Sequence, residues 1–232
     1  MIQRQKEFKA VLFDLDGTLI EFKFPIEESR RALIDFLKTR DYDVELLNNN
    51  TRTQDLIDTA KEQWATSPKL KKAHSFVELR ENLYRILDSF EFDSIKASKP
   101  LAGCLDVIRK LNEAGILTGI VTNSGRAAVN SRLSEYGYLP YMKVVITRDE
   151  MTRMKPRPDG LLVAKNMLQL NKDDLLYVGD SILDIEAAQE AGIRCASIAS
   201  GIFTTERLRK MRPDFLLRSL DELEGIFLLD RS

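Results

Sequence analysis

The sequence predicts an α/β fold in which a three-layer core with a central parallel sheet is interrupted by an inserted all-helical domain. From residue 97 onward, short apolar runs of strand length alternate with amphipathic helical patterns, as in parallel sheets with helical crossovers. One further apolar run, Ala10 to Phe13, stands apart near the N-terminus. Between them, residues 21–96 show helical patterns and no convincing strand. We therefore expect a discontinuous core domain of residues 1–20 and 97–232, with a helical domain of residues 21–96 inserted in it.

The composition is typical of a globular protein with one large or two modest domains. The chain has 232 residues, of which 44% are hydrophobic and 31% charged, and its formal net charge is -1. A charge near zero argues against a broad electrostatic surface for nucleic acid or anionic membranes. The sequence contains no apolar run of membrane-spanning length and no N-terminal signal peptide. Cys104 and Cys195 lack metal-binding spacing and read as free thiols of a reduced compartment, so we expect a cytoplasmic protein of unspecified oligomeric state.

The apolar run Ala10 to Phe13 is too short and too rich in β-formers to be a helix of its own. It ends at Asp14 and Asp16, whose side chains lie on the same side of an extended chain and repel one another. A divalent cation, a shared proton or a nearby lysine would compensate this repulsion. Gly17 allows a sharp turn and the close approach of an amide to a ligand. An ordinary Asp-Gly turn after a strand is the alternative interpretation.

The insert consists of amphipathic helical patterns separated by polar loops. Its apolar residues recur at helical spacing in Ile26–Thr39, Thr51–Ala65 and Ser75–Phe90. The first two of these patterns are separated by the polar segment Asp41–Asn50, which ends in three asparagines.

Strands and helices then alternate to the end of the chain. The predicted helices, several of them closed by a glycine, are Ala102–Ala114, Gly125–Tyr136, Pro158–Leu170, Ser181–Ala191 and a last one from Leu220. The predicted strands are Ile116–Thr122, Lys143–Thr147, Asp174–Gly179, Ile193–Ile198 and a short one at Asp214–Leu217.

Polar side chains follow four of the predicted strands. Because binding sites in open parallel sheets lie beyond the carboxyl ends of the strands, we expect these side chains to meet at one edge. In chain order they are Asp14 and Asp16; Thr122, Asn123 and Ser124; Lys155; and Asp180, with Asp184 one helical turn later.

Four motifs in this order resemble those of the haloacid dehalogenase-like hydrolase superfamily. They are DLDGTL (14–19), VTNSG (121–125), KPRPDG (155–160) and VGDSILDIEAAQEAG (178–192). The resemblance covers the alternating core and implies a Rossmann-like sheet. The insert occupies the place where members of subfamily I, such as phosphoglycolate phosphatases, carry a helical cap domain.

The resemblance implies a role for each matching residue. Asp14 would be the nucleophile that attacks phosphorus, and Asp16 would be first the general acid and then the general base. Thr122, with Asn123 alongside, would hold the transferring phosphoryl group. Lys155 would steady the charge of the nucleophile and of the phosphate.

The resemblance also implies a Mg²⁺ site. Asp180 would bind the ion, Asp184 would be a direct or indirect ligand, and Asp14 would give a carboxylate oxygen and Asp16 its main-chain carbonyl. Magnesium prefers oxygen ligands, and a hard cation with a lysine removes the repulsion between a carboxylate and an anionic phosphate. Backbone amides near Gly17 and at the start of the helix after Asn123 would receive phosphate oxygens.

We therefore expect a Mg²⁺-dependent phosphatase for a small phosphorylated metabolite, with phosphoglycolate and sugar phosphates as candidates. A leaving alkoxide needs a proton, which Asp16 could hold if the crowded acids share one. A phosphomutase using the same aspartyl-phosphate is one alternative. A phosphate-sensing or partner-binding protein without turnover is the other, although such a protein would not need Asp16.

Overall fold

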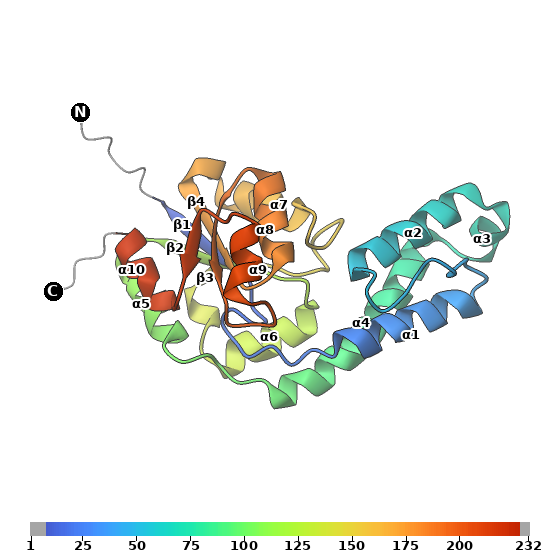
Figure 1. Cartoon of the computed structure of the whole chain (residues 1–232), viewed down its shortest axis with the longest axis horizontal. Coiled ribbons are helices and arrows are strands. Elements are labelled where there is room, and N and C mark those ends of the chain that lie inside the picture. The colour runs from blue at the N-terminus through green and yellow to red at the C-terminus, as the bar shows by residue number, and fades with distance from the viewer. Residues whose placement is uncertain (1–7, 228–232) are drawn as a thin grey trace. The chain divides into compact units, whose positions relative to one another are not determined.

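The computed structural model of the chain describes residues 8–227 (Figure 1). The chain folds into two compact units, one of Met1–Phe22 with Ser98–Ser232 and the other of Lys23–Ala97. The first is the α/β unit and the second is the helical unit. Within the described residues, no helix combines the length and the apolar character that a membrane crossing requires.

The α/β unit is built on a six-stranded parallel sheet in the order β3-β2-β1-β4-β5-β6, which confirms the predicted fold class. Strand β1 is central, with β2 and β4 as its neighbours. Phe13, the last residue of β1, is in register with Ile120 in β2 and Val178 in β4, so the three strands end at nearly the same level. The strands are β1 (Ala10–Phe13), β2 (Leu117–Val121), β3 (Met142–Ile146), β4 (Leu175–Gly179), β5 (Arg194–Ile198) and β6 (Phe215–Leu217).

Helices cover both faces of the sheet, which makes the core three-layered (Figure 1). On one face, α5 (Cys104–Glu113), α6 (Arg126–Glu135) and α10 (Leu223–Ile226) join Val11 and Phe13 in a single apolar cluster. On the other face, α7 (Asp159–Leu168) and α8 (Ile182–Ala191) pack on each other and on the strands. The strands are therefore buried from both sides, as their continuous apolar runs predict. Helix α9 (Thr205–Lys210) contacts β6.

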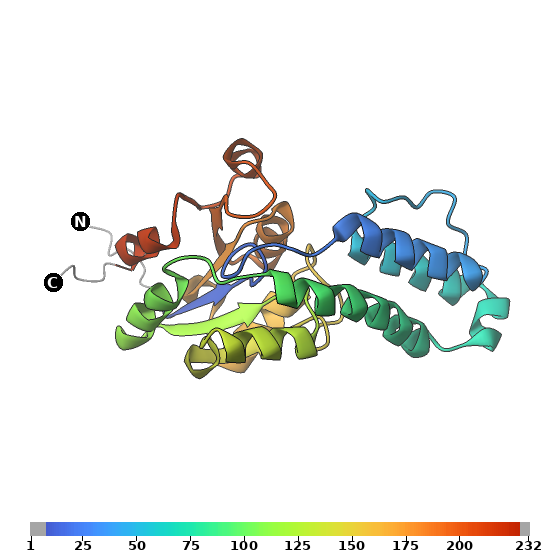
Figure 2. The same ribbon diagram turned by 90° about the horizontal axis from the view of Figure 1, so that it is seen from below.

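The helical unit has four helices and, in its described residues, no strand, as expected for the insert (Figure 2). Its interior holds buried leucines from the helices and a buried hydrogen bond of 2.9 Å between the hydroxyl of Tyr42 and Nε2 of His74. The last helix extends to Ala97, further than the predicted end at Phe90, and the six-residue α3 was not predicted. The helices are α1 (Ile26–Thr39), α2 (Thr53–Thr66), α3 (Pro68–Ala73) and α4 (Phe76–Ala97).

The two chain segments that leave and re-enter the α/β unit are hydrogen bonded to one another. The amide of Glu21 donates to the carbonyl of Lys99 at 2.8 Å, and the amide of Leu101 donates to that of Leu19 at 2.9 Å. Ile20 and Pro100 form an isolated antiparallel bridge between them. The α/β unit thus closes on itself at the point where the helical unit is inserted.

Candidate active site

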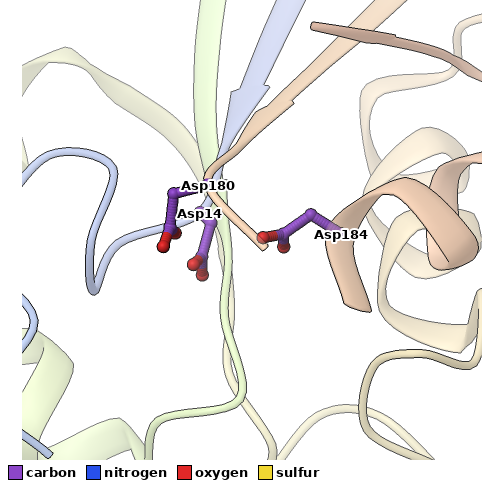
Figure 3. Close-up of side chains that lie close together, drawn as sticks. All are labelled: Asp14, Asp180 and Asp184. Atoms are coloured by element: carbon purple, nitrogen blue, oxygen red, sulfur yellow. The ribbon is translucent and has the colours of Figure 1, made fainter. Parts of the chain in front are cut away.

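Three buried carboxylates meet at the carboxyl end of the central strands (Figure 3). Asp14 directly follows β1, Asp180 directly follows β4, and Asp184 lies in the first turn of α8. One carboxylate oxygen from each lies within 4.8 Å of the other two. The sequence-based expectation that these strand ends deliver their acids to one place therefore agrees with the geometry.

Local structure fixes the position of each acid. The amide of Asp14 donates to the carbonyl of Val178 at 2.8 Å, which extends the β1–β4 ladder by one residue. At the start of α8, Ser181 and Asp184 form a capping box, in which each side chain accepts a hydrogen bond from the other residue's amide. Asp184 thus caps its own helix while its other oxygen, Oδ1, lies 2.7 Å from Nζ of Lys155.

Lys155 joins the acids with a single buried ammonium group. Its Nζ lies 2.7 Å from Oδ1 of Asp14 and 2.7 Å from Oδ1 of Asp184. It also donates to the hydroxyl of Tyr177 at 2.9 Å, and that hydroxyl lies 2.8 Å from the same oxygen of Asp184. Lys155 is 5% exposed, so these contacts form away from water. One cation is therefore shared between two of the three carboxylates.

Asn123 binds the backbone of Lys155 through both ends of its side-chain amide. Its Nδ2 donates to the carbonyl of Lys155 at 3.0 Å, and its Oδ1 accepts from the amide of Lys155 at 2.8 Å. The neighbouring Thr122 is buried, and its hydroxyl oxygen accepts from the amide of Ser124 at 3.2 Å. Asn123 thus fixes the residue that carries the ammonium group, while Thr122 retains its hydroxyl proton for donation.

The cluster holds three carboxylates and one lysine, so its negative charge exceeds its positive charge, and the pKa values of its members are shifted. Burial, opposed by Lys155 and reinforced by Asp184, raises the pKa of Asp14 to about 7. Burial, with Asp184 and Asp14 adding to it, raises the pKa of Asp180 well above its usual range. For Asp184, burial is outweighed by Lys155 and by hydrogen bonds from Ser181, and its pKa is lowered. Burial lowers the pKa of Lys155, but Asp14 and Asp184 together raise it above the usual value.

These residues fit a hard divalent cation. The donors are all carboxylate oxygens, which Mg²⁺ prefers, and the cluster contains no histidine or cysteine. One lysine against three carboxylates leaves charge that a divalent ion would neutralise. Close packing also holds Asp180 in place, because a Cβ added at Gly17 or at Gly201 would overlap its carboxylate. The hydroxyl of Thr18 donates to Oδ1 of Asp180 at 3.1 Å.

The carboxylate of Asp16 is not part of this cluster, so the expectation that it meets the other acids and shares a proton with them is wrong. Its Oδ1 accepts from Nη1 of Arg132 at 2.8 Å, and its Oδ2 accepts from the hydroxyl of Ser124 at 2.6 Å. The amide of Gly17 donates to the carbonyl of Ile20 at 2.7 Å, so within this turn it is engaged by the chain itself. The glycine is nonetheless required there, because its φ is +93° and its Cα lies against Asp180.

Several residues of the site escape sequence reasoning. Ser124 was expected at this edge together with Thr122 and Asn123, but nothing in the motif distinguishes it as a partner of Asp16. Tyr177 and Arg132 lie outside the loops that follow the strands, and Gly201, in the loop after β5, has no polar side chain that would mark it as part of a site. Tyr177 sits inside β4, where an aromatic residue is ordinary core, and only the structure shows its hydroxyl among the charged groups.

Comparison with known proteins gives consistent matches. A profile described as haloacid dehalogenase-like hydrolase matches residues 11–198. A pyrophosphatase PpaX from Anoxybacillus flavithermus is 31% identical over 94% of this chain and 95% of its own length. An N-acetylmuramic acid 6-phosphate phosphatase from Pseudomonas aeruginosa is 27% identical over 88% and 87%. The crystal structure of a predicted phosphoglycolate phosphatase from Haemophilus somnus has a similar fold, with a TM-score of 0.63, 21% identity and coverage of 94% and 97%.

Proposed function

Because the chain belongs to the haloacid dehalogenase-like hydrolase family and is a phosphatase of that family, we propose that it is a Mg²⁺-dependent enzyme acting on a small phosphorylated metabolite. The observation that carries this proposal is the meeting of Asp14, Asp180, Asp184 and Lys155 at the end of the central strand. Three chain segments, which follow β1, β3 and β4, supply these four residues, and their charges suit one cation and one phosphate.

Asp14 is the nucleophile in this proposal. Lys155 contacts Oδ1 of Asp14 at 2.7 Å, which leaves Oδ2 to attack phosphorus. A bond forms between that oxygen and phosphorus while the bond from phosphorus to the leaving oxygen breaks, giving an aspartyl-phosphate and an alcohol. Splitting the transfer into two steps in this way is what a covalent nucleophile contributes. Water then attacks phosphorus, and inorganic phosphate and free Asp14 result.

Asp16 handles the proton in both steps. It gives a proton to the leaving oxygen in the first step and takes one from the attacking water in the second, so it ends as it began. Its carboxylate lies two residues beyond the nucleophile in the same loop. This role distinguishes the two acids of the DLDGTL segment, because one forms the covalent bond and the other moves the proton.

The remaining residues of the site neutralise and orient the phosphoryl group. The ammonium of Lys155 and the hydroxyl of Thr122 donate to its oxygens, and Asn123 keeps Lys155 in place through its backbone. Asp14, Asp180, Asp184 and the main-chain carbonyl of Asp16 would hold Mg²⁺, which when bound supplies positive charge to the phosphate oxygens. Positioning and charge neutralisation are the main requirements of phosphoryl transfer.

The helical unit, residues 23–97, is proposed to act as a cap that selects the leaving group. Lids of this kind exclude water and complete a site when substrate is bound. The relatives named above support a test panel containing pyrophosphate, N-acetylmuramic acid 6-phosphate, hexose 6-phosphates and phosphoglycolate. Phosphoglycolate or a sugar phosphate is the substrate class that we propose.

The test is phosphate release from this panel and from p-nitrophenyl phosphate, with Mg²⁺ or with EDTA. We expect Mg²⁺-dependent turnover by the wild type and none by Asp14→Asn, while Asp106→Asn on the exposed side of α5 behaves as the wild type. Full activity of Asp14→Asn would end the nucleophile assignment. Isomer formation without phosphate release would identify a mutase, and no reaction across the panel would revive the alternative of a binding protein without turnover.

A further inference from the structure

A second ion pair, between a buried arginine and the partly buried Asp16, lies near the acidic cluster. Arg132 of α6 is 1% exposed, and its Nη1 donates to Oδ1 of Asp16 at 2.8 Å. The hydroxyl of Ser124 donates to the other oxygen, Oδ2, at 2.6 Å. Both oxygens of one carboxylate are therefore held from the loop and the helix that follow β2, although Asp16 itself follows β1.

The position of Arg132 in its helix is unusual for an arginine. Its neighbours on the buried face of α6 are Ala128, Val129 and Leu133, of which the last two belong to the apolar cluster of the sheet. An apolar residue at position 132 would satisfy the same packing without taking a guanidinium out of water, which is costly unless the charge is paired. The arginine is thus explained by what it binds and not by the needs of the helix.

A carboxylate that transfers a proton must be held in a fixed orientation, and hydrogen bonds to both of its oxygens provide this restraint. Asp16 lies in a turn between Asp14 and Ile20, and a carboxylate held at one oxygen can still rotate about its remaining torsions. Donors on both oxygens restrict that rotation, and each oxygen retains a second lone-pair direction for the proton it exchanges. Small errors in the placement of an acid–base group cost large factors in rate.

We propose that Arg132, together with Ser124, positions the carboxylate of Asp16 for proton transfer to the leaving oxygen. Arg132 acts through Asp16 and touches no substrate, so it is a positioning residue. This inference rests on the proposed function, because it assigns a purpose to the acid–base step of that reaction. It extends the site to a helix that carries none of the motif residues.

The test uses the leaving group as the probe. The ratio kcat/KM reports the steps up to departure of the leaving group, and p-nitrophenolate departs without a proton whereas an alkoxide needs one. General acid catalysis contributes about 10²–10⁴-fold to such steps. For Arg132→Met we expect kcat/KM to fall at least about tenfold more for the alkyl phosphate that the wild type hydrolyses fastest than for p-nitrophenyl phosphate. Arg132→Lys keeps the charge but loses the planar fork. In this variant, the difference between the two substrates should be smaller than in Arg132→Met.

A matched control separates positioning from loss of stability. Leu133→Ala opens a cavity next to Arg132 on the same buried face of α6, so it should lower the melting temperature but leave the ratio between the two substrates unchanged. In an Asp16→Asn background, Arg132→Met should change that ratio no further.

Three results would overturn the inference: an equal fall for both substrates in Arg132→Met, the same change of ratio in Leu133→Ala, or a full additional effect in the Asp16→Asn background. A wild type without activity on either substrate would instead contradict the proposed function.

Discussion

Replacing Asp180 by asparagine should stabilise the metal-free protein while removing its response to Mg²⁺. The substitution keeps the shape of the side chain and the acceptor for the hydroxyl of Thr18. It removes one of three buried carboxylates, and the new amide can donate to the other two. A change that improves stability at the expense of ion binding is expected where like charges have been gathered for a ligand.

The magnitude follows from the geometry. The carboxylate oxygens lie within 4.8 Å of one another, and two unit charges at that separation repel by about 3 kcal/mol at an effective dielectric constant of about 20. If Asp180 instead takes up a proton at pH 7, the cost is about 4 kcal/mol, because the unfolded group has a pKa of about 4. Loss of its attraction to Lys155 reduces either figure. For a chain of this size, about 2–3 kcal/mol corresponds to a melting temperature about 5–10 °C higher.

The effect should depend on pH in a defined direction. Burial, followed by the charges of Asp184 and Asp14, raises the pKa of Asp180, so the native state binds a proton that the unfolded state has lost. The contribution of Asp180 to stability is therefore fully present below about pH 4 and is lost as the pH rises towards its folded pKa. The difference in melting temperature between the variant and the wild type should be small near pH 4 and largest at neutral pH.

Differential scanning fluorimetry in EDTA and in Mg²⁺ measures both effects. At about 100 times its dissociation constant, Mg²⁺ should stabilise the wild type by about 2.7 kcal/mol and the variant by little. Asp106→Asn, at an exposed carboxylate of α5 that is 70% accessible, should show neither change. A lower melting temperature for Asp180→Asn than for the wild type in EDTA at pH 7.5, or an equal Mg²⁺ response in both, would refute the reasoning.

Three further predictions concern the same cluster. Lys155→Met leaves Asp14 and Asp184 without their shared cation, so the metal-free protein should lose about 3–5 kcal/mol of stability and kcat/KM for p-nitrophenyl phosphate at least about a hundredfold; an unchanged melting curve in EDTA would contradict this. Gly201→Ala places a methyl group against Asp180, and isothermal titration should show that this variant binds Mg²⁺ at least about tenfold more weakly than the wild type. In the control Gly225→Ala, the added Cβ meets no atom within 4 Å, so Mg²⁺ should bind as it does to the wild type. Because burial, opposed by Lys155, raises the pKa of Asp14 to about 7, Mg²⁺ binding should release protons at pH 6 and tighten as the pH rises; titrations in two buffers of different ionisation heat should differ, and identical heats would count against the assignment.

The central part of the fold follows from the sequence because the rule behind it is simple. Parallel strands end at a common edge, so the residues after β1 and β4 had to meet, and Asp14, Asp180 and Asp184 do meet. Lys155 is reached by the same rule, through the loop that follows β3. The strands were recognisable as short continuous apolar runs between helices, and the long helices because their apolar periodicity persists over enough residues.

Short helices and long side chains are what sequence reasoning could not reach. Helices α3 and α9 have six residues each, too few to show a period, although Ser67 before Pro68 and Thr204 are N-cap signals. Arg132 bonds to a residue 116 positions away, and an arginine in a polar helix gives no sign of where its guanidinium lies. The separation of Asp16 from Asp14 likewise depends on partners that only the folded chain brings together.

The hydrogen bond between Glu21 and Lys99 has a consequence for which inserted domains this fold can accept. The segments that leave and re-enter the α/β unit, residues 19–21 and 99–101, are hydrogen bonded to each other. From the side of the sheet, the insertion therefore resembles a short hairpin. We therefore expect changes in the length or sequence of the inserted segment to transmit little strain to the active site. On the proposed role of the helical unit in selecting the leaving group, the inserted unit could be exchanged between these two segments while the residues that break the phosphorus–oxygen bond stay the same.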